Sequence, residues 1–306
     1  MKYINIEGTD LHVSSLAMGC MRIDSLTPAE LERHVRQGME LGINYFDHAD
    51  IYGGGACERL FSTVISDQPA LRQRMVIQSK CGIRDGYYDF SKAYILESVD
   101  GILSRLGTDY LDILLLHRPD VLMEPEEVAE AFDQLERSGK VRYFGVSNQN
   151  PMQMELLGQT VHQRLILNQL QLSAVHTPVV DSGIAANTLL PQGIDRTGSV
   201  LEYCRARNMM IQAWSPFQKG TFGGPFVGDR THYPELCGML DLLAERYGVT
   251  PTAIAVAWLL RIPGQTSVVL GTVHEDHLRE SCAGAEITMT RKEWYAVYHA
   301  AGNPIP

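Results

Sequence analysis

The chain has 306 residues, of which 45% are apolar and 20% are charged, and its formal net charge is −10. This excess of acidic side chains, without any block of lysine or arginine, argues against a nucleic acid as partner. The opening residues MKYINIEGTDLHV lack the apolar core of a signal peptide, and the longest apolar runs, such as 253–260, are too short to span a bilayer. Six scattered cysteines indicate free thiols. We therefore expect a cytoplasmic globular protein without a membrane partner.

A hairpin opens the predicted fold, and strands then alternate with amphipathic helices along the chain. The hairpin covers residues 2–13. Eight short apolar runs are predicted strands, at 16–18, 44–47, 75–79, 113–117, 142–146, 167–169, 210–214 and 268–270. Helical periodicity predicts helices over 27–42, 91–107 and 124–140, and near 195–208, 235–247, 251–261 and 275–283.

The number and order of these elements decide the fold class. Eight strand–helix units with apolar strands favour a closed (β/α)8 TIM barrel with an N-terminal β-hairpin over an open sheet. A doubly wound sheet is the alternative, and the lack of a G-x-G-x-x-G motif after the first strand weakens it. Without a linker or an internal repeat, residues 1–306 are expected to form a single barrel domain. Two irregular stretches, 175–193 and 219–234, would be loops that shape a binding mouth.

Polar residues follow the predicted strands at their carboxyl ends, where a barrel of this class carries its chemistry. In YFDHADIYGGG, Asp47 ends the second strand and Tyr52 lies just beyond it, while Lys80 ends the third strand and His117 the fourth. Each has a purely structural explanation: Lys80 could extend into solvent, His117 could be a core histidine, Asp47 could cap the turn and Tyr52 could fill space. Because adjacent strands bring all four to one mouth, we interpret them as a proton-donor unit.

The segments that carry these residues resemble the aldo-keto reductase family. GINYFDHADIYGGGACERLF resembles its signature, QSKCG and LLLHRPD resemble its lysine and histidine segments, and GKVRYFGVSN, LNQLQ and AWSPF resemble its cofactor-binding segments. The resemblance extends from the hairpin to the last helix. Within the family, the chain most resembles a bacterial branch of predicted oxidoreductases. It implies the reduction of small aldehydes or ketones to alcohols with NADPH, NADH being possible, and no metal site is expected.

The resemblance also implies a role for each catalytic residue. Tyr52 would donate the proton, Lys80 and Asp47 would tune its acidity, and His117 would orient the carbonyl. Physical chemistry agrees, because a nearby ammonium lowers the pKa of a phenol from about 10, and a carboxylate keeps that ammonium charged. The hydride would come from the nicotinamide, since no side chain supplies one.

A second set of residues would bind the cofactor, again by resemblance. Ser147, Asn148 and Gln169 would hold the carboxamide, and Trp214 would stack on the nicotinamide ring. The pyrophosphate and adenosine would lie along Ser215, Phe217, Lys219, Gly220, Gly271, Thr272, Val273, His274 and His277. Relatives commonly carry lysine or arginine where this chain has a threonine and two histidines in the last segment, so the preference for NADPH is expected to be weaker than in those relatives.

Two other classes of function are alternatives for these residues. A Schiff-base lyase on the same barrel would use Lys80 as its nucleophile, although the aspartate–tyrosine pair argues against it. A non-catalytic or regulatory nicotinamide-binding module of the same fold, as in the β-subunits of potassium channels, would retain all four residues. The substrate is not named by the sequence. Expected pocket walls, which suggest moderately apolar aldehydes or ketones, are Met21, Ile23, Tyr87, Tyr88, Leu122, Phe217, Phe222 and Tyr233.

Overall fold

A closed barrel of eight parallel strands forms the centre of the computed structural model, which describes residues 1–66, 68–219 and 223–306. The barrel closes in the order β10-β3-β4-β5-β6-β7-β8-β9. Its strands are β3 (Leu16–Gly19), β4 (Tyr45–Asp47), β5 (Val76–Cys81), β6 (Leu111–Leu116), β7 (Val141–Ser147), β8 (Leu165–Gln171), β9 (Met210–Trp214) and β10 (Thr266–Leu270). The predicted (β/α)8 barrel is confirmed, with each of its eight predicted strands.

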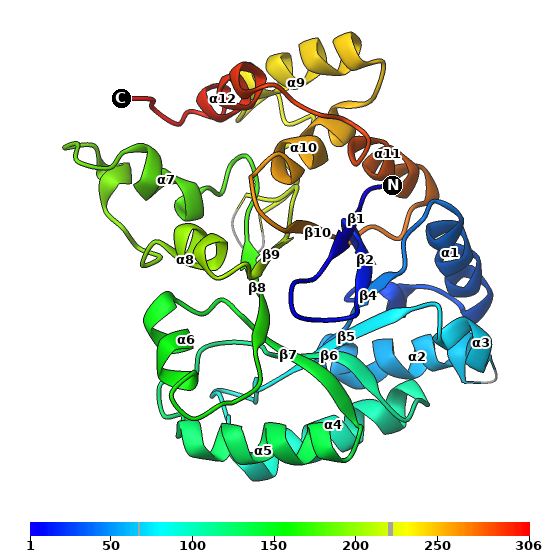
Figure 1. Ribbon diagram of the computed structural model, residues 1–306. Coiled ribbons are helices and arrows are strands. Elements are labelled where there is room, and N and C mark those ends of the chain that lie inside the picture. Colours follow the sequence, from blue (N-terminus) through cyan, green and yellow to red (C-terminus); the bar gives the residue numbers. More distant parts are fainter. Residues whose placement is uncertain (67, 220–222) are drawn as a thin grey trace.

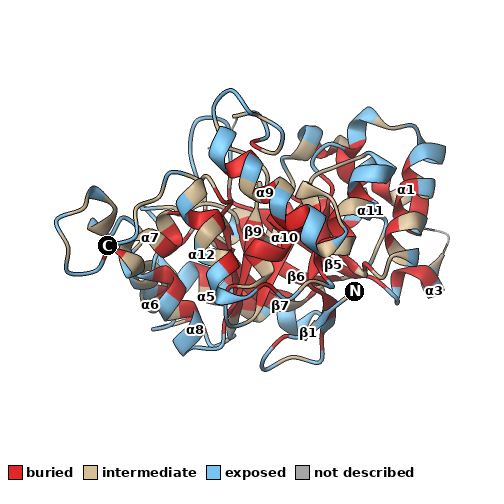
Figure 2. Cartoon of the chain, turned by 90° about the horizontal axis from the view of Figure 1, so that it is seen from above, coloured by how far each residue is buried: buried red, intermediate tan, exposed pale blue. Residues whose placement is uncertain are grey.

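Helices surround the barrel as an outer ring, which Figure 1 shows around the central strands. They are α1 (Pro28–Glu40), α2 (Ala56–Ile65), α3 (Pro69–Arg72), α4 (Lys92–Leu106), α5 (Pro125–Arg137), α6 (Pro151–Leu157), α7 (Pro178–Ile184), α8 (Val200–Ala206), α9 (Pro234–Tyr247), α10 (Pro251–Leu260), α11 (Glu275–Gly284) and α12 (Arg291–Ala300). Short 3₁₀ turns are η1 (Ile23–Ser25), η2 (Tyr52–Gly55) and η3 (Pro191–Gly193). Buried residues concentrate in the strands and on the inner faces of the helices (Figure 2), as a two-layer barrel requires.

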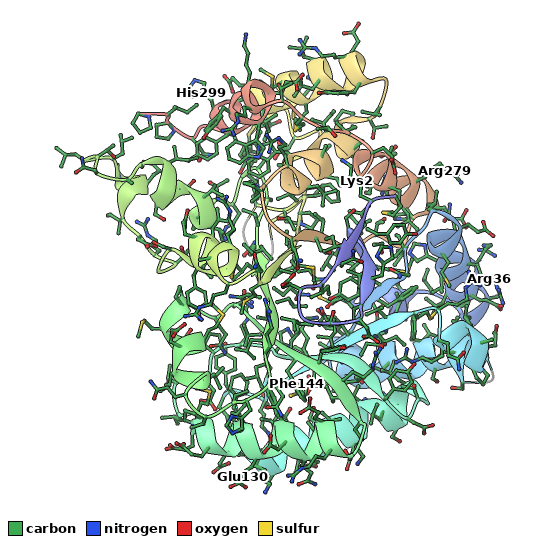
Figure 3. All side chains as sticks on the ribbon, in the orientation of Figure 1. Lys2, Arg36, Glu130, Phe144, Arg279 and His299 are labelled. Atoms are coloured by element: carbon green, nitrogen blue, oxygen red, sulfur yellow. The ribbon has the colours of Figure 1, made fainter. Side chains whose placement is uncertain are left out.

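Local sequence explains where these helices begin. At α1, Thr27 Oγ1 accepts a hydrogen bond from the Glu30 backbone N–H at 3.3 Å, and Glu30 Oε2 accepts one from the Thr27 N–H at 2.8 Å. This reciprocal pair satisfies two donors that the first turn leaves free. Between the barrel and α5, the rings of Phe132 and Phe144 stack with their centroids 4.0 Å apart. Arg36, Glu130 and Arg279, labelled in Figure 3, lie at the periphery.

Some predicted boundaries were wrong. The stretch 175–193 was expected to be irregular, but it contains α7 and η3. A proline at the first position of α7 fits a helix start, and Val179 and Val180 bury its inner face. The helix expected near 195–208 begins only at Val200, because Ser199 has a positive φ of 56°. Helices α2, α3, α6 and α12 were not predicted.

The predicted hairpin is present and closes the amino end of the barrel. Strands β1 (Tyr3–Asn5) and β2 (His12–Ser14) pair antiparallel, and Figure 1 shows them across the centre of the helical ring. Apolar hairpin residues share a buried cluster with the barrel interior. Arg142 fixes the hairpin to the barrel, because its guanidinium lies 2.6 Å from Asp10 Oδ2 and 2.9 Å from Asp112 Oδ1. The polar strand ends lie at the opposite end.

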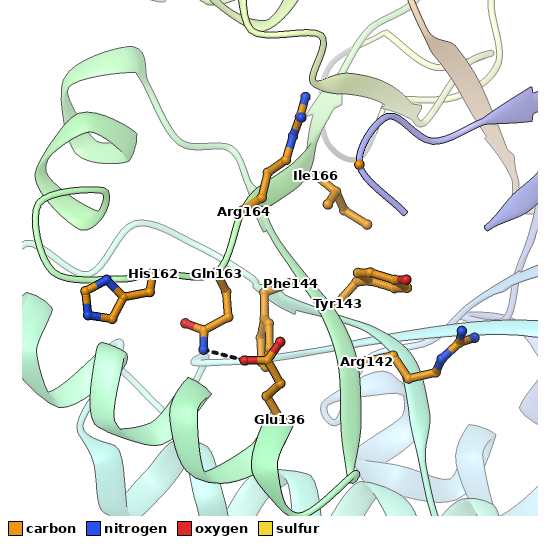
Figure 4. A pocket seen from close by; sticks show the side chains of 9 residues that line it. Glu136, Arg142, Tyr143, Phe144, His162, Gln163, Arg164 and Ile166 are labelled. Atoms are coloured by element: carbon orange, nitrogen blue, oxygen red, sulfur yellow. Dashed lines mark hydrogen bonds between the residues drawn. The ribbon is translucent and has the colours of Figure 1, made fainter. Parts of the chain in front are cut away.

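Two recesses of the surface lie away from those polar strand ends. One, of about 270 Å³, is drawn in Figure 4 and is lined by Gly8, Glu136, Arg142, Tyr143, Phe144, His162, Gln163, Arg164 and Ile166. The other, of about 450 Å³, lies between α4 and the start of β7. No residue that was predicted to be catalytic or to bind the cofactor lines either recess. Among the described residues, no helix combines the length and hydrophobicity that a membrane crossing requires.

Candidate active site

Four predicted catalytic side chains converge at the carboxyl ends of β4, β5 and β6. Asp47 is the last residue of β4, and Lys80 is the penultimate residue of β5. His117 directly follows β6, and Tyr52 begins η2. Because side chains alternate along a strand, Asp47 and Lys80 both point into the barrel from neighbouring strands.

Lys80 is the centre of this group and is fully buried. Its Nζ donates to Tyr52 Oη at 3.0 Å, to Asp47 Oδ2 at 2.9 Å and to the carbonyl oxygen of His48 at 2.7 Å. Three acceptors therefore satisfy all three protons of the ammonium. The arrangement links the carboxylate to the phenol through one positive charge.

A reversal of the chain between Asp47 and Tyr52 leads into a glycine turn. Gly53, Gly54 and Gly55 have φ of 56°, 58° and 83°, in the left-handed region that residues with a Cβ rarely adopt. Before these glycines, the Tyr52 N–H donates to the Ala49 carbonyl at 3.1 Å, which closes a turn over residues 49–52. The reversal at residues 49–52 explains how Asp47 and Tyr52, five positions apart, reach the same lysine.

Burial and charge set the protonation of the group. Burial raises the pKa of the Tyr52 hydroxyl, and the Lys80 ammonium opposes that rise. Burial alone would lower the pKa of Lys80, but the Asp47 carboxylate and the Tyr52 oxygen outweigh it, so that the pKa is raised and the ammonium stays charged. Burial, together with the charges of Lys80 and Arg118, lowers the pKa of His117 well below its usual range. The His117 ring is therefore neutral at pH 7.

His117 faces the tyrosine across the mouth. The two rings lie edge to face with their centroids 6.3 Å apart. The Nδ1 of His117 has no hydrogen-bond partner among the described residues. A neutral imidazole carries one N–H donor, which is the group needed to hold a carbonyl oxygen near Tyr52.

A layer of amide side chains supports Asp47 from inside the barrel, and only Gln169 among them was predicted from the sequence to belong to the site. Gln78 and Gln169 each donate to Asp47 Oδ1, at 2.6 and 2.9 Å. Both also donate to Gln212 Oε1, at 2.8 and 2.7 Å, and Tyr45 donates to Gln78 Oε1. The overlooked signal was a glutamine at an inward position of an otherwise apolar strand, as in VIQSK and MIQAW.

The residues expected around the nicotinamide form one chain of hydrogen bonds. Trp214 Nε1 donates to Asn148 Oδ1 at 3.1 Å, Asn148 Nδ2 to Ser147 Oγ at 2.8 Å, and Ser147 Oγ to the Gln169 carbonyl at 2.9 Å. Asn148 has a positive φ of 58°, which asparagine tolerates better than most residues. The chain connects the carboxyl ends of β7, β8 and β9.

The loop after β9 contains the residues expected along the pyrophosphate. Ser215 has a positive φ of 52° and donates to Gln218 Oε1 at 3.3 Å. Phe217 is partly buried against the core. Lys219 Nζ lies 3.7 Å from Asp229 Oδ2. Gly220, and the expected pocket wall Phe222, lie outside the described residues.

The adenosine segment lies between β10 and α11. Residues 271–273 are half-buried, whereas His274 and His277 are exposed, and their rings lie 5.3 Å apart. His274 is the N-cap of α11. A helix N-terminus favours a phosphate, but Glu275 and Asp276 in the first turn oppose it.

The donor set of the mouth fits a nicotinamide ring. A carboxamide requires both donors and acceptors. Asn148 contains both, and Gln169 contributes its Oε1 as an acceptor, because its Nε2 is bound to Asp47 and Gln212. The indole of Trp214 is half-buried and provides a flat apolar surface. The charged Lys80 lies beneath the mouth, bound to Tyr52.

Comparison with known proteins agrees with this geometry. Residues 15–300 match the model of the aldo/keto reductase family. Over 305 residues, the chain is 34% identical to "Oxidoreductase YdhF" of Escherichia coli (strain K12), covering 96% of this chain and 95% of that one. It is 32% identical to a 6-dehydroglucose reductase of Agrobacterium fabrum over 95% of both chains.

A solved structure shares the fold. The crystal structure of the thermostable aldo-keto reductase Tm1743 with the inhibitor epalrestat superposes with a TM-score of 0.78, at 23% identity, covering 98% of this chain and all of that one. The family match and the two bacterial relatives span nearly the whole chain. The chain therefore belongs to the aldo/keto reductase family of NAD(P)H-dependent oxidoreductases.

Proposed function

We propose that the protein reduces aldehydes or ketones to alcohols and that Tyr52 donates the proton to the carbonyl oxygen. The observation that carries the proposal is the position of Lys80 Nζ, 3.0 Å from Tyr52 Oη and 2.9 Å from Asp47 Oδ2. The ammonium stabilises the phenolate that remains after proton transfer. The hydride comes from a reduced nicotinamide cofactor, because no side chain supplies one.

His117 positions the substrate in this proposal. Its neutral ring donates one hydrogen bond to the carbonyl oxygen and thereby keeps that oxygen within reach of the Tyr52 hydroxyl. A charged imidazolium would compete with Tyr52 as the proton donor, so a lowered pKa of His117 suits the orienting role. Lys80 is fully charged and has three acceptors, which disfavours the alternative Schiff-base lyase, since a nucleophilic amine must be neutral.

The cofactor preference and the substrate belong to the same proposal. Ser147, Asn148 and Gln169 would hold the carboxamide, and Trp214 would face the ring. The cofactor would extend past Ser215, Phe217, Lys219, Gly220 and 271–273 to His274 and His277. Because this path ends at His274 and His277 and not at lysine or arginine, we propose that the protein has only a modest preference for NADPH over NADH. The six cysteines are free and buried, which fits the reducing cytoplasm.

Substitution of Tyr52 tests the function. Tyr52→Phe should lower kcat by about 10² or more, while the affinity for the reduced cofactor stays nearly unchanged, because only the proton donor is lost. Steady-state kinetics on a panel of aldehydes and ketones, with fluorescence titration of the cofactor, measures both quantities.

A matched control removes the same atom at the other end of the barrel. The Tyr143 hydroxyl donates to Asp10 Oδ1 at 2.9 Å and lies beside the hairpin. Tyr143→Phe should leave kcat close to that of the wild type. If Tyr52→Phe keeps most of the turnover, Tyr52 is not the acid.

A further inference from the structure

The barrel interior beneath the catalytic group contains three glutamines and a tyrosine where apolar side chains usually lie. Gln78 and Gln212 are fully buried, as is Tyr45, and Gln169 is 3% exposed. Branched apolar side chains fill this layer in most barrels of the class. Burying an amide costs free energy unless its hydrogen bonds are made. Local rules are most often broken at functional sites, so this layer calls for a functional explanation.

Two glutamines of the layer bind the carboxylate of Asp47, and the other hydrogen bonds of the layer orient these two amides. A carboxylate only accepts, so Gln78 and Gln169 must present their Nε2 atoms to Asp47 Oδ1, at 2.6 and 2.9 Å. Each Nε2 then has a second proton. Gln212 Oε1 accepts both, at 2.8 and 2.7 Å. Gln212 thereby fixes the planes of the two amides that bind Asp47.

Tyr45 completes the arrangement from below. Its hydroxyl donates to Gln78 Oε1, which fixes the direction of that amide and keeps its nitrogen on the side of Asp47. Lys80 Nζ, which donates to Asp47 Oδ2, also lies 2.8 Å from Oδ1, so the two glutamines and the ammonium surround the same carboxylate. The amides therefore determine where the carboxylate sits, and the carboxylate determines where the ammonium sits.

We propose that Gln78, Gln212 and Tyr45 are positioning residues that hold Asp47, and through it Lys80, in the orientation that Tyr52 requires. The inference rests on the proposed role of Tyr52 as the acid. Neither Gln212 nor Tyr45 has a hydrogen bond to Lys80 or Tyr52 among those of the described residues. Their effect on the reaction must therefore pass through Gln78, Gln169 and Asp47.

The pH profile of alcohol oxidation reports on this effect. In that direction the Tyr52 phenolate accepts the proton, so activity rises with pH as the phenol ionises. The groups that face Tyr52 are Lys80 on β5, Asp47 on β4, Cys20 after β3 and His117 after β6. All four remain in the variants below. A less well aligned Lys80 lowers the pKa of Tyr52 less effectively, so the rising limb should move to higher pH.

Isosteric substitutions remove the amides without emptying the layer. Gln78→Met should move the rising limb upward by about half a unit to one unit and lower kcat by roughly tenfold, with little change in cofactor affinity, since a hydrogen bond to a charged group is lost. Gln212→Met should shift the limb in the same direction. Tyr45→Phe removes a single hydroxyl and should give the smallest shift. Tyr45→Phe also tests the positioning role if neither glutamine variant folds.

Asn168 provides the matched control on β8. It is a fully buried amide next to Gln169, but its Nδ2 donates to the Gln149 carbonyl at 2.8 Å and contacts Met154 of α6, outside the barrel. Asn168→Leu should destabilise the fold without moving the limb. A limb that stays at the wild-type pH in every folded variant of the amide layer would overturn the inference.

The two proposals fail in different ways. If Tyr52→Phe abolishes turnover while the amide variants keep the wild-type profile, only the positioning role is lost. If Tyr52→Phe remains active, the acid itself is wrongly assigned, whatever the amide variants do.

Discussion

His48 should make the stability of the protein sensitive to acid in a way that a single substitution removes. Its side chain is fully buried, and its ring lies edge on to Phe61 with the centroids 4.5 Å apart. Among the described residues, neither ring nitrogen has a hydrogen-bond partner. Burial, and to a smaller degree the Lys80 ammonium, lowers the pKa of His48 to about 3. The perturbation we consider is His48→Leu, which keeps the bulk and removes the titrating group.

The direction of this pH dependence follows from the protonation of His48 in the unfolded and the folded chain. An unfolded histidine takes up a proton as the pH falls through about 6.5, whereas folded His48 resists until about pH 3. Protons therefore favour the unfolded state between these values. Stability is fully present above pH 6.5 and is lost progressively below it. Between pH 7.5 and 5.0, the loss due to this group amounts to about 2 kcal/mol.

Urea denaturation of wild type and His48→Leu at both pH values measures this difference. Other buried groups, including His34 and His176, titrate equally in both proteins and cancel from the comparison. The wild type should lose about 2 kcal/mol more than the variant on going from pH 7.5 to 5.0. His162 is exposed, so His162→Leu is the control and should lose as much as the wild type. Equal losses in wild type and His48→Leu would refute the reasoning.

Two further predictions concern the reaction and the cofactor. Lys80→Met should abolish most activity. When the wild type is treated with borohydride in the presence of substrate, mass spectrometry should find no adduct. An adduct on Lys80 would place the protein among lyases. The ratio of the NADH to the NADPH dissociation constant should fall as the pH rises from 7 to 8.5, because imidazoles lose their charge above about pH 6.5 and bind a phosphate less well. His274→Ala or His277→Ala should flatten that slope in fluorescence titrations, and a wild-type ratio that is constant over this range would show that neither histidine contacts the phosphate.

The barrel and the group around Lys80 could be predicted because they depend on short-range patterns. Apolar runs bounded by turns mark strands, and in a parallel barrel the carboxyl end of each strand has a known location. Asp47, Lys80 and His117 follow directly from that rule. Tyr52 required one further assumption, that the chain turns back between Asp47 and Tyr52.

Other features depend on contacts that no local pattern specifies. The direction of the Gln78 amide is decided by Tyr45 and Gln212, from two other strands. His48 follows Asp47 in the sequence, but alternation turns it outward against Phe61 of α2, and its burial depends on that helix. The side chains of Lys219 and His274 lie on loops, whose backbone the strand pattern leaves undetermined.

The pairing of β3 with β10 has a consequence for biosynthesis. Val268 pairs with Leu16, and Leu270 with Met18, so the ring closes between segments about 250 residues apart. While the ribosome extends the chain, β3 and β9 remain unpaired edges until β10 has emerged. Such edges recruit other strands, and a nascent chain of this type is exposed to misassembly for most of its synthesis. A ribosome that stalls before β10 would release an open sheet, which is a natural client for chaperones.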